Sequence, residues 1–126
     1  MSRQPIEVQW VKSSSGQFLD LLRVNLNSSY FNVPRFGVYI IWHTGASSAP
    51  VITVGQGNIR ERLGALRVSS HINQYSSSGQ LKVSWILINQ QDFDGVEAFL
   101  YDYYKPLVGE RKQVSELIPV NPLLSL

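Results

Sequence analysis

Apolar side chains cluster in three short runs of the chain, and this pattern predicts a small β-sheet. Residues 38–43 are β-branched and aromatic, and the apolar run 51–54 follows them after a Gly/Ser/Pro-containing loop at 44–50. Two such runs joined by a short loop are typical of a β-hairpin. The third run, 81–89, is apolar at its centre, which favours a strand buried on both faces. We therefore expect a central three-stranded, mainly antiparallel sheet.

Two segments have apolar residues three and four positions apart, which is the period of a helix with one buried face. The first begins at Ile59, after a Gly-Gln-Gly sequence at 55–57 that we expect to end the second strand. Asn58 is suited to be its N-cap. The second covers residues 95–105, with Asp94 as its expected N-cap. The expected apolar stripes are Ile59, Leu63 and Leu66 on the first helix, and Val96, Phe99, Leu100, Tyr103 and Leu107 on the second.

The first 36 residues precede this alternation, and we interpret them as an N-terminal extension packed on the same domain as residues 37–126. Residues 5–11 alternate like an edge strand, and the apolar spacing within 18–26 predicts a short amphipathic helix. The remaining polar or Pro-containing segments are expected to be a loop at 27–36, a loop or frayed helix end at 69–80, and an extended tail over the core at 118–122. This order of elements predicts a small α/β or α+β sandwich.

Composition sets the broad class of the protein. The 126 residues include three Trp, six Tyr and five Phe, enough to build the core of one domain. No run reaches the roughly 18 apolar residues of a membrane span, and the N-terminus lacks the apolar region of a signal peptide. The absence of cysteine excludes disulfides and zinc–thiolate sites, and we expect a cytoplasmic protein. The net charge of +2 hints only weakly at a polyanionic partner.

Three arginines, Arg60, Arg62 and Arg67, fall within eight residues of the first predicted helix and its end, with Glu61 as the only acid among them. A solvated helix face would explain such a run without any function. The helical period places Arg62 beside the apolar stripe, on the flank that could lean toward the strand bearing Tyr39. Arg60 and Arg67 fall on the other flank, so the three do not form one patch.

Several short motifs follow one another along these elements. They are Gly37-Val38-Tyr39, Thr53-Val54-Gly55, the stretch Gly57-Asn58-Ile59-Arg60-Glu61-Arg62-Leu63, Glu97, and Asn121 after Pro119. Their order and placement over about residues 37–123 resemble the GIY-YIG nuclease superfamily. The segments at 54–57, 106–111 and 119–121 are also similar to those of small bacterial proteins in that superfamily. The resemblance implies a GIY-YIG-like fold and an endonuclease that hydrolyses phosphodiester bonds in DNA or, alternatively, in RNA.

The resemblance also implies roles for individual residues. Tyr39 would lie near the attacking water, Arg62 would bind the scissile phosphate, and Glu97 would hold one Mg²⁺ or Mn²⁺ ion. Such an ion suits a single carboxylate because Mg²⁺ keeps much of its hydration shell. Further residues are candidates for support of catalysis or for substrate binding: Thr53, Gln56, Arg60, Arg67, His71 and Asn121. A separate protein that supplies sequence specificity is a further expected partner.

Three positions depart from the family pattern. Thr53 replaces a tyrosine, Gln56 stands where many members carry lysine, and Leu66 stands where many carry histidine. A second alignment would instead pair Arg67 with His71, four residues later. These departures leave open a catalytically silent binding module with the same fold.

Glu97 also has a purely structural interpretation. It lies three residues after Asp94, the spacing of a capping box. If such packing and capping roles explain all the motifs, the chain is an interaction domain. Convergence of Tyr39, Arg62 and Glu97 on one open cleft would favour the first two interpretations over this third one.

Overall fold

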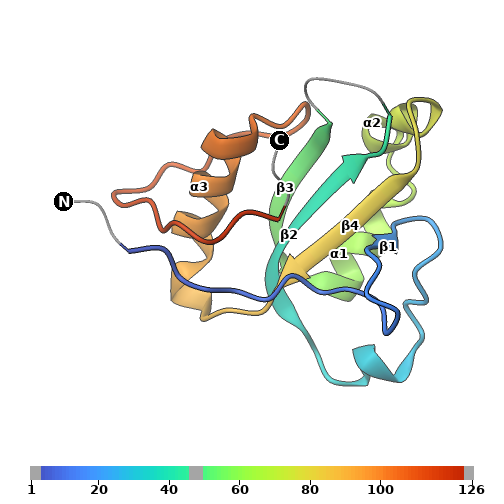
Figure 1. The fold of residues 1–126 in the computed structure, drawn as a ribbon, viewed down its shortest axis with the longest axis horizontal. Coiled ribbons are helices and arrows are strands. Elements are labelled where there is room, and N and C mark those ends of the chain that lie inside the picture. Colours follow the sequence, from blue (N-terminus) through green and yellow to red (C-terminus); the bar gives the residue numbers. More distant parts are fainter. Residues whose placement is uncertain (1–3, 46–49, 124–126) are drawn as a thin grey trace.

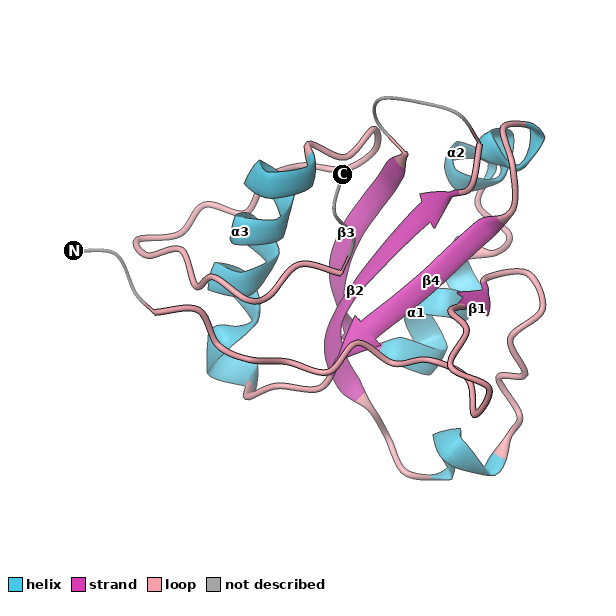
Figure 2. Cartoon of the chain, in the orientation of Figure 1, coloured by secondary structure: helices cyan, strands magenta, loops and turns pink. Residues whose placement is uncertain are grey.

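The computed structural model describes residues 4–45 and 50–123, so the centre of the predicted loop at 44–50 lies outside the described residues. Within them the fold is α+β, as the sequence predicts, and is built on one antiparallel sheet of order β1-β4-β2-β3 (Figure 1). Its strands are β1 (Leu19–Asp20), β2 (Phe36–His43), β3 (Val51–Asn58) and β4 (Leu81–Ile86). The helices are α1 (Ile59–Leu66), α2 (Ser70–Asn73) and α3 (Phe93–Tyr104), with short 3₁₀ turns at 29–32, 74–77 and 90–92 (Figure 2).

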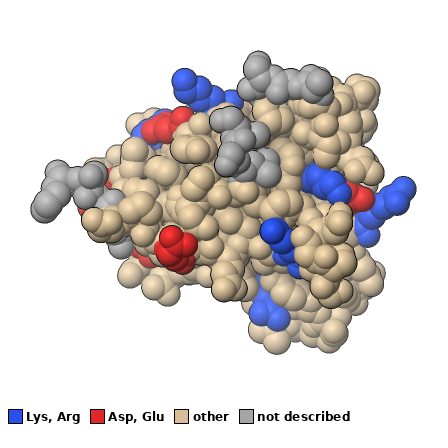
Figure 3. Space-filling view, viewed as in Figure 1, with Lys and Arg blue, Asp and Glu red and all other residues tan. Residues whose placement is uncertain are grey.

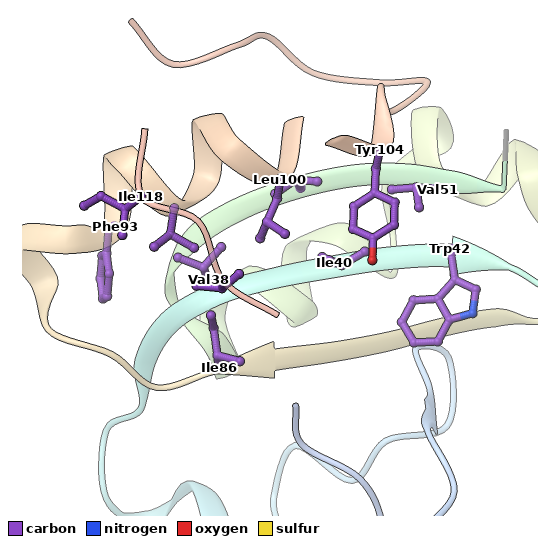
Figure 4. Close-up of a cluster of buried hydrophobic side chains, with 12 residues drawn as sticks. Val38, Ile40, Trp42, Val51, Ile86, Phe93, Leu100, Tyr104 and Ile118 are labelled. Carbon is purple, nitrogen blue, oxygen red and sulfur yellow. The ribbon is translucent and has the colours of Figure 1, made fainter. Parts of the chain in front are cut away.

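The sheet separates two hydrophobic clusters, one under α1 and one under α3. Alternate residues of β2 point to opposite faces, as a pleated strand requires. Val38 and Ile40 meet the α3 side chains Phe93, Leu100 and Tyr104, together with Ile118 of the C-terminal tail (Figure 4). The cluster on the other face contains Tyr39, Ile41, Trp85, Leu21 and Phe31, and the buried α1 residues Ile59 and Leu63. The N-terminal extension therefore contributes to the core itself.

The prediction of three strands is wrong by one, because β1 replaces the amphipathic helix expected over 18–26. Leu19 pairs with Val83 of β4 in an antiparallel register. The apolar residues of this segment are not on one stripe. Phe18 packs edge-on against Trp42 in the α3-side cluster, whereas Leu21 is buried in the α1-side cluster. The segment thus crosses from one face of the sheet to the other, which a helix with a single apolar face could not do.

The second predicted strand is longer than expected, because β3 continues through the Gly-Gln-Gly sequence to Asn58. Gly55 and Gly57 pair with Tyr39 and Gly37 of β2. A Cβ atom at Gly55 would overlap the phenol ring of Tyr39. The glycine therefore makes room for an aromatic ring on the neighbouring strand, and it does not interrupt the pairing.

The N-cap predicted for α1 is confirmed, whereas the one predicted for α3 is wrong. The Asn58 side chain accepts a hydrogen bond from the Glu61 backbone N–H at 3.1 Å. Helix α3 begins at Phe93, whose ring is buried in the core, and its N-cap is Asp92. Asp94 lies in the first turn, and in the described structure no side chain makes a capping bond to this helix.

Two remaining segments differ from expectation. The polar stretch 69–80 contains α2 and a 3₁₀ turn, which bury Ile72. Residues 5–11 do not form the predicted edge strand: Ile6 makes a single bridge to Val120, and the segment is held by further hydrogen bonds, among them those from the Val11 N–H to the Trp85 carbonyl and from the Val8 N–H to the Asn121 side chain. Within residues 4–45 and 50–123, no helix combines the length and the apolar character needed to cross a membrane.

Candidate functional site

A pocket of about 410 Å³ opens at the β3 edge of the sheet. Its walls come from β2, β3, all three α-helices and the loop that follows α3. The polar side chains that line it are Tyr39, Thr53, Gln56, Arg62, Ser69, His71, Glu97, Glu110 and Lys112. Three elements that are distant in sequence, β2, α1 and α3, thus supply the phenol of Tyr39, the guanidinium of Arg62 and the carboxylate of Glu97 to one hollow.

Tyr39 reaches this pocket by crossing over β3. It lies opposite Gly55 in the sheet, and the missing side chain at Gly55 leaves space for the ring. The side chain is almost fully buried, and its Oη accepts a hydrogen bond from Nη2 of Arg62 at 3.4 Å. This distance is long for a hydrogen bond, so the contact is weak and leaves Arg62 free to reorient.

Arg62 is oriented by the turn from β3 into α1. Gly57 has φ of +134°, a backbone conformation that favours glycine, and it directs the chain from the strand to the Asn58 cap. A Cβ atom at Gly57 would lie 3.3 Å from Cγ of Arg62, so the arginine stem packs closely over this turn. Arg62 is the fourth residue of α1, and its exposed guanidinium thereby faces the pocket.

Glu97 is buried on α3 and is only 6% exposed, so its carboxylate needs a partner. Nε2 of Gln56 supplies it, donating to Oε1 of Glu97 at 3.1 Å. The same nitrogen donates to Oδ1 of Asp94 at 2.8 Å. Gln56 therefore bridges the two carboxylates and positions Glu97 at the pocket. The capping-box interpretation of Asp94 and Glu97 is wrong, because both side chains bond to β3.

Burial determines the protonation of both buried acids in the pocket. Desolvation raises the pKa of Tyr39 above its ordinary value of 10.0, although the hydrogen bond from Arg62 and its charge act in the opposite direction. Desolvation likewise raises the pKa of Glu97 above 4.5, against the hydrogen bond from Gln56 and the charge of Lys112. Tyr39 is thus a neutral phenol at pH 7, and Glu97 favours the protonated form more than an exposed glutamate does.

The raised pKa of Glu97 predicts a pH-dependent stability that glutamine should remove. Because the folded pKa lies above the unfolded one, the folded state binds more protons between them, and stability falls as pH rises through this window. We expect Glu97→Gln to gain stability relative to wild type from about pH 4.5 upward, with the difference levelling above the folded pKa. Urea unfolding of both proteins at a series of pH values, in the presence of a chelator, measures this difference in unfolding free energy. A stability difference independent of pH would contradict the expectation.

Lys112 was not singled out by the sequence, yet it lines the pocket. The loop after α3 folds back along the β3 edge, where the N–H groups of Leu107 and Val108 donate to the carbonyls of Val51 and Ile52. This docking brings Lys112 to the pocket, with its Nζ 3.8 Å from Oδ1 of Asp94. The run Glu110-Arg111-Lys112 is the only sequence signal, and charge runs after a helix are common on solvated surfaces.

The other predicted site residues divide into two groups. Thr53 and His71 line the pocket, with Thr53 buried and His71 exposed on α2. Arg60, Arg67 and Asn121 bond to the N-terminal extension instead. Nη2 of Arg67 donates to the carbonyls of Leu21 and Val24, at 3.0 and 2.7 Å, and Nη2 of Arg60 donates to Asn27 Oδ1 at 3.1 Å. The Asn121 amide bonds to both the N–H and the carbonyl of Val8.

Glu97 is the residue that the sequence predicts as the ligand of a divalent ion. Among the residues that the structure describes, no three His, Cys, Asp or Glu side chains form a group that could hold a metal. A single carboxylate on a pocket wall fits Mg²⁺ or Mn²⁺ that keeps its other ligands as water and substrate oxygens. Gln56 donates a hydrogen bond to one Glu97 oxygen and so orients the carboxylate. Carboxylates that bind metals are commonly held by such a partner.

The chemistry of the pocket is acid–base and electrostatic. It combines the neutral phenol of Tyr39, the weakly hydrogen-bonded guanidinium of Arg62 and the carboxylate of Glu97. Comparisons with protein-family models, with curated proteins and with solved structures find no match to this chain. The case for an activity therefore rests on these groups and on their arrangement.

Proposed function

We propose that the protein is a divalent-metal-dependent endonuclease that hydrolyses phosphodiester bonds in DNA, with a GIY-YIG-like fold. One observation carries the proposal. Tyr39, Arg62 and Glu97 come from β2, α1 and α3, and all three line the same open pocket. If the three motifs served only packing, their side chains would not be expected to line the same solvent-accessible pocket.

Each of the three side chains has a distinct part in the proposed hydrolysis. Arg62 binds the non-bridging oxygens of the scissile phosphate, for which a planar guanidinium is well suited, and stabilises the charge that develops there. Glu97 would hold the ion, and the bound ion would act as a Lewis acid on the phosphate and on the attacking water. Gln56 keeps the Glu97 carboxylate directed into the pocket through the 3.1 Å hydrogen bond.

Tyr39 acts in this proposal by orienting the attacking water. Because burial raises the pKa of Tyr39, the phenol is protonated in the free protein, and its oxygen can accept a hydrogen bond from that water. Proton removal by Tyr39 would require positive charge near its oxygen beyond that of Arg62, because the pKa of Tyr39 is raised even with the hydrogen bond and the charge of that arginine.

Thr53 favours a second candidate function, a binding module that keeps the pocket but hydrolyses little. It stands where the resemblance expects a tyrosine, and its short side chain is 7% exposed on the pocket wall. A threonine hydroxyl cannot extend to the pocket centre as a phenol would. Such a module would still bind the DNA backbone through Arg62 and Lys112.

A plasmid-nicking assay distinguishes the two functions. The wild-type protein is incubated with supercoiled plasmid in Mg²⁺, in Mn²⁺ and in EDTA. We expect relaxed circles to accumulate with either metal and not with EDTA. Binding of the plasmid without nicking would instead establish the silent module. Absence of both binding and nicking from a folded protein would contradict both proposals.

A further inference from the structure

The two layers on either side of the sheet carry opposite charge. The α1-side layer, residues 21–35 and 59–77, holds Arg23, Arg35, Arg60, Arg62 and Arg67 against the single acid Glu61. The α3-side layer, residues 4–10 and 90–123, holds Lys105, Arg111 and Lys112 against Glu7, Asp92, Asp94, Glu97, Asp102, Glu110 and Glu116. In Figure 3 most visible Asp and Glu side chains lie over the α3 half, and most Lys and Arg side chains over the half with α1 and β1. The small net charge hides this division.

The N-terminal extension and α1 contact each other within the basic layer. Arg67 and Arg60 tie the two segments together through their bonds to Leu21, Val24 and Asn27. Arg23 lies on the extension, and its side chain is exposed like those of Arg60 and Arg62. Cations of two distant segments, Arg23, Arg35, Arg60 and Arg62, therefore lie on the α1 side of the sheet, and we call this side the arginine face.

Arg35 shows that this face also carries an ordered cation. Its guanidinium lies 4.3 Å from the centre of the Tyr30 ring, and its Nε donates to the Tyr30 carbonyl at 3.0 Å. Packing of a guanidinium on an aromatic ring fixes the side chain and reduces the entropy lost when it binds an anion. The arginine face thus presents at least one preoriented charge and three exposed ones.

We infer that the arginine face binds the phosphate backbone of duplex DNA, so that one strand continues into the pocket at Arg62. The inference rests on the proposed function and specifies which surface receives its substrate. Arginines that neutralise phosphates release counterions, and this release drives sequence-independent binding. The α3-side layer, with seven carboxylates against three cations, repels the same polyanion, so the charge division orients the duplex on the protein.

The test compares two double charge reversals that change net charge equally. Arg23→Glu with Arg60→Glu alters the arginine face, and Lys105→Glu with Arg111→Glu alters two cations of the α3-side layer. Fluorescence anisotropy of a labelled 20-bp duplex is measured from 50 to 200 mM NaCl. We expect the first variant to lose at least about tenfold in affinity, and the slope of log affinity against log salt to become shallower by about two. The second variant should keep the wild-type slope.

Either of two results would overturn the inference. One is equal weakening of both variants, which would show an effect of net charge alone. The other is a wild-type protein that does not bind the duplex. The outcome is separable from that of the proposed function. Binding through the arginine face without nicking would support the inference and contradict the proposed nuclease activity. Nicking that is unaffected by Arg23→Glu with Arg60→Glu would support the nuclease activity and contradict the inference.

Discussion

Replacing Glu97 by glutamine is expected to abolish metal-dependent nicking while the protein stays folded. Glutamine has nearly the same volume and keeps a carbonyl oxygen that can accept the hydrogen bond from Gln56. It removes the anionic oxygens that a hard divalent cation prefers. Because burial already raises the pKa of Glu97, the neutral amide should not destabilise the metal-free protein. We expect nicking of supercoiled plasmid in Mg²⁺ to fall to the level seen in EDTA.

The matched control for this variant is Asp102→Asn, which removes one carboxylate from the same helix. Asp102 is exposed, pairs with Arg111 at 2.7 Å and does not line the pocket. Its replacement should leave nicking near the wild-type rate. Circular dichroism and urea unfolding establish that both variants are folded. Retained nicking by Glu97→Gln would show that Glu97 does not bind the ion.

Truncation of Arg62 is expected to give the second large effect, a loss of about 10²–10³-fold in the nicking rate, which is typical of removing one stabilising donor from an active site. Only its stem packs over Gly57, and its one bond in the described structure is the long contact to Tyr39. Arg62→Ala should therefore change stability little. The rate is measured with protein in excess over plasmid, so that weaker DNA binding does not limit it.

Two variants bracket the role of Arg62. Arg62→Lys keeps the charge but loses the planar fork that binds two phosphate oxygens, so we expect only partial recovery of the rate. Lys105→Ala, which removes an exposed cation outside the pocket, should not change the rate. A rate for Arg62→Ala within a fewfold of wild type would exclude a direct role on the phosphate.

The sequence predicts the long strands of the sheet and both amphipathic helices, because each has a strong local period. The N-terminal extension is different. Phe18 and Leu21 are three residues apart, as on a helix face, yet they pack on opposite sides of the sheet. Their partners, Trp42 and the α1-side cluster, lie elsewhere in the chain. A pattern shared by a helix and by a chain that crosses a sheet edge can be resolved only by those long-range contacts.

The candidate site follows the same division between local and long-range information. The motif order predicts which strand or helix carries Tyr39, Arg62 and Glu97, and the structure brings their side chains to one pocket. The sequence does not reveal that Gln56 bonds to Asp94 and Glu97, 38 and 41 residues away. It also places Asn121 in the site by motif alone, whereas its amide bonds to Val8, more than a hundred residues away.

The loop after α3 has a consequence beyond the position of Lys112. The outer edge of an edge strand offers unpaired N–H and carbonyl groups to which another chain can add a strand. Here the N–H groups of Leu107 and Val108 occupy two carbonyls of β3, and the opposite edge strand, β1, is only two residues long. The Val51–Ile52 end of the outer β3 edge is therefore not open to a strand from another molecule. The loop therefore protects the fold against aggregation through β-sheet extension, and substitutions that detach it would expose a polymerisation-prone edge beside the pocket.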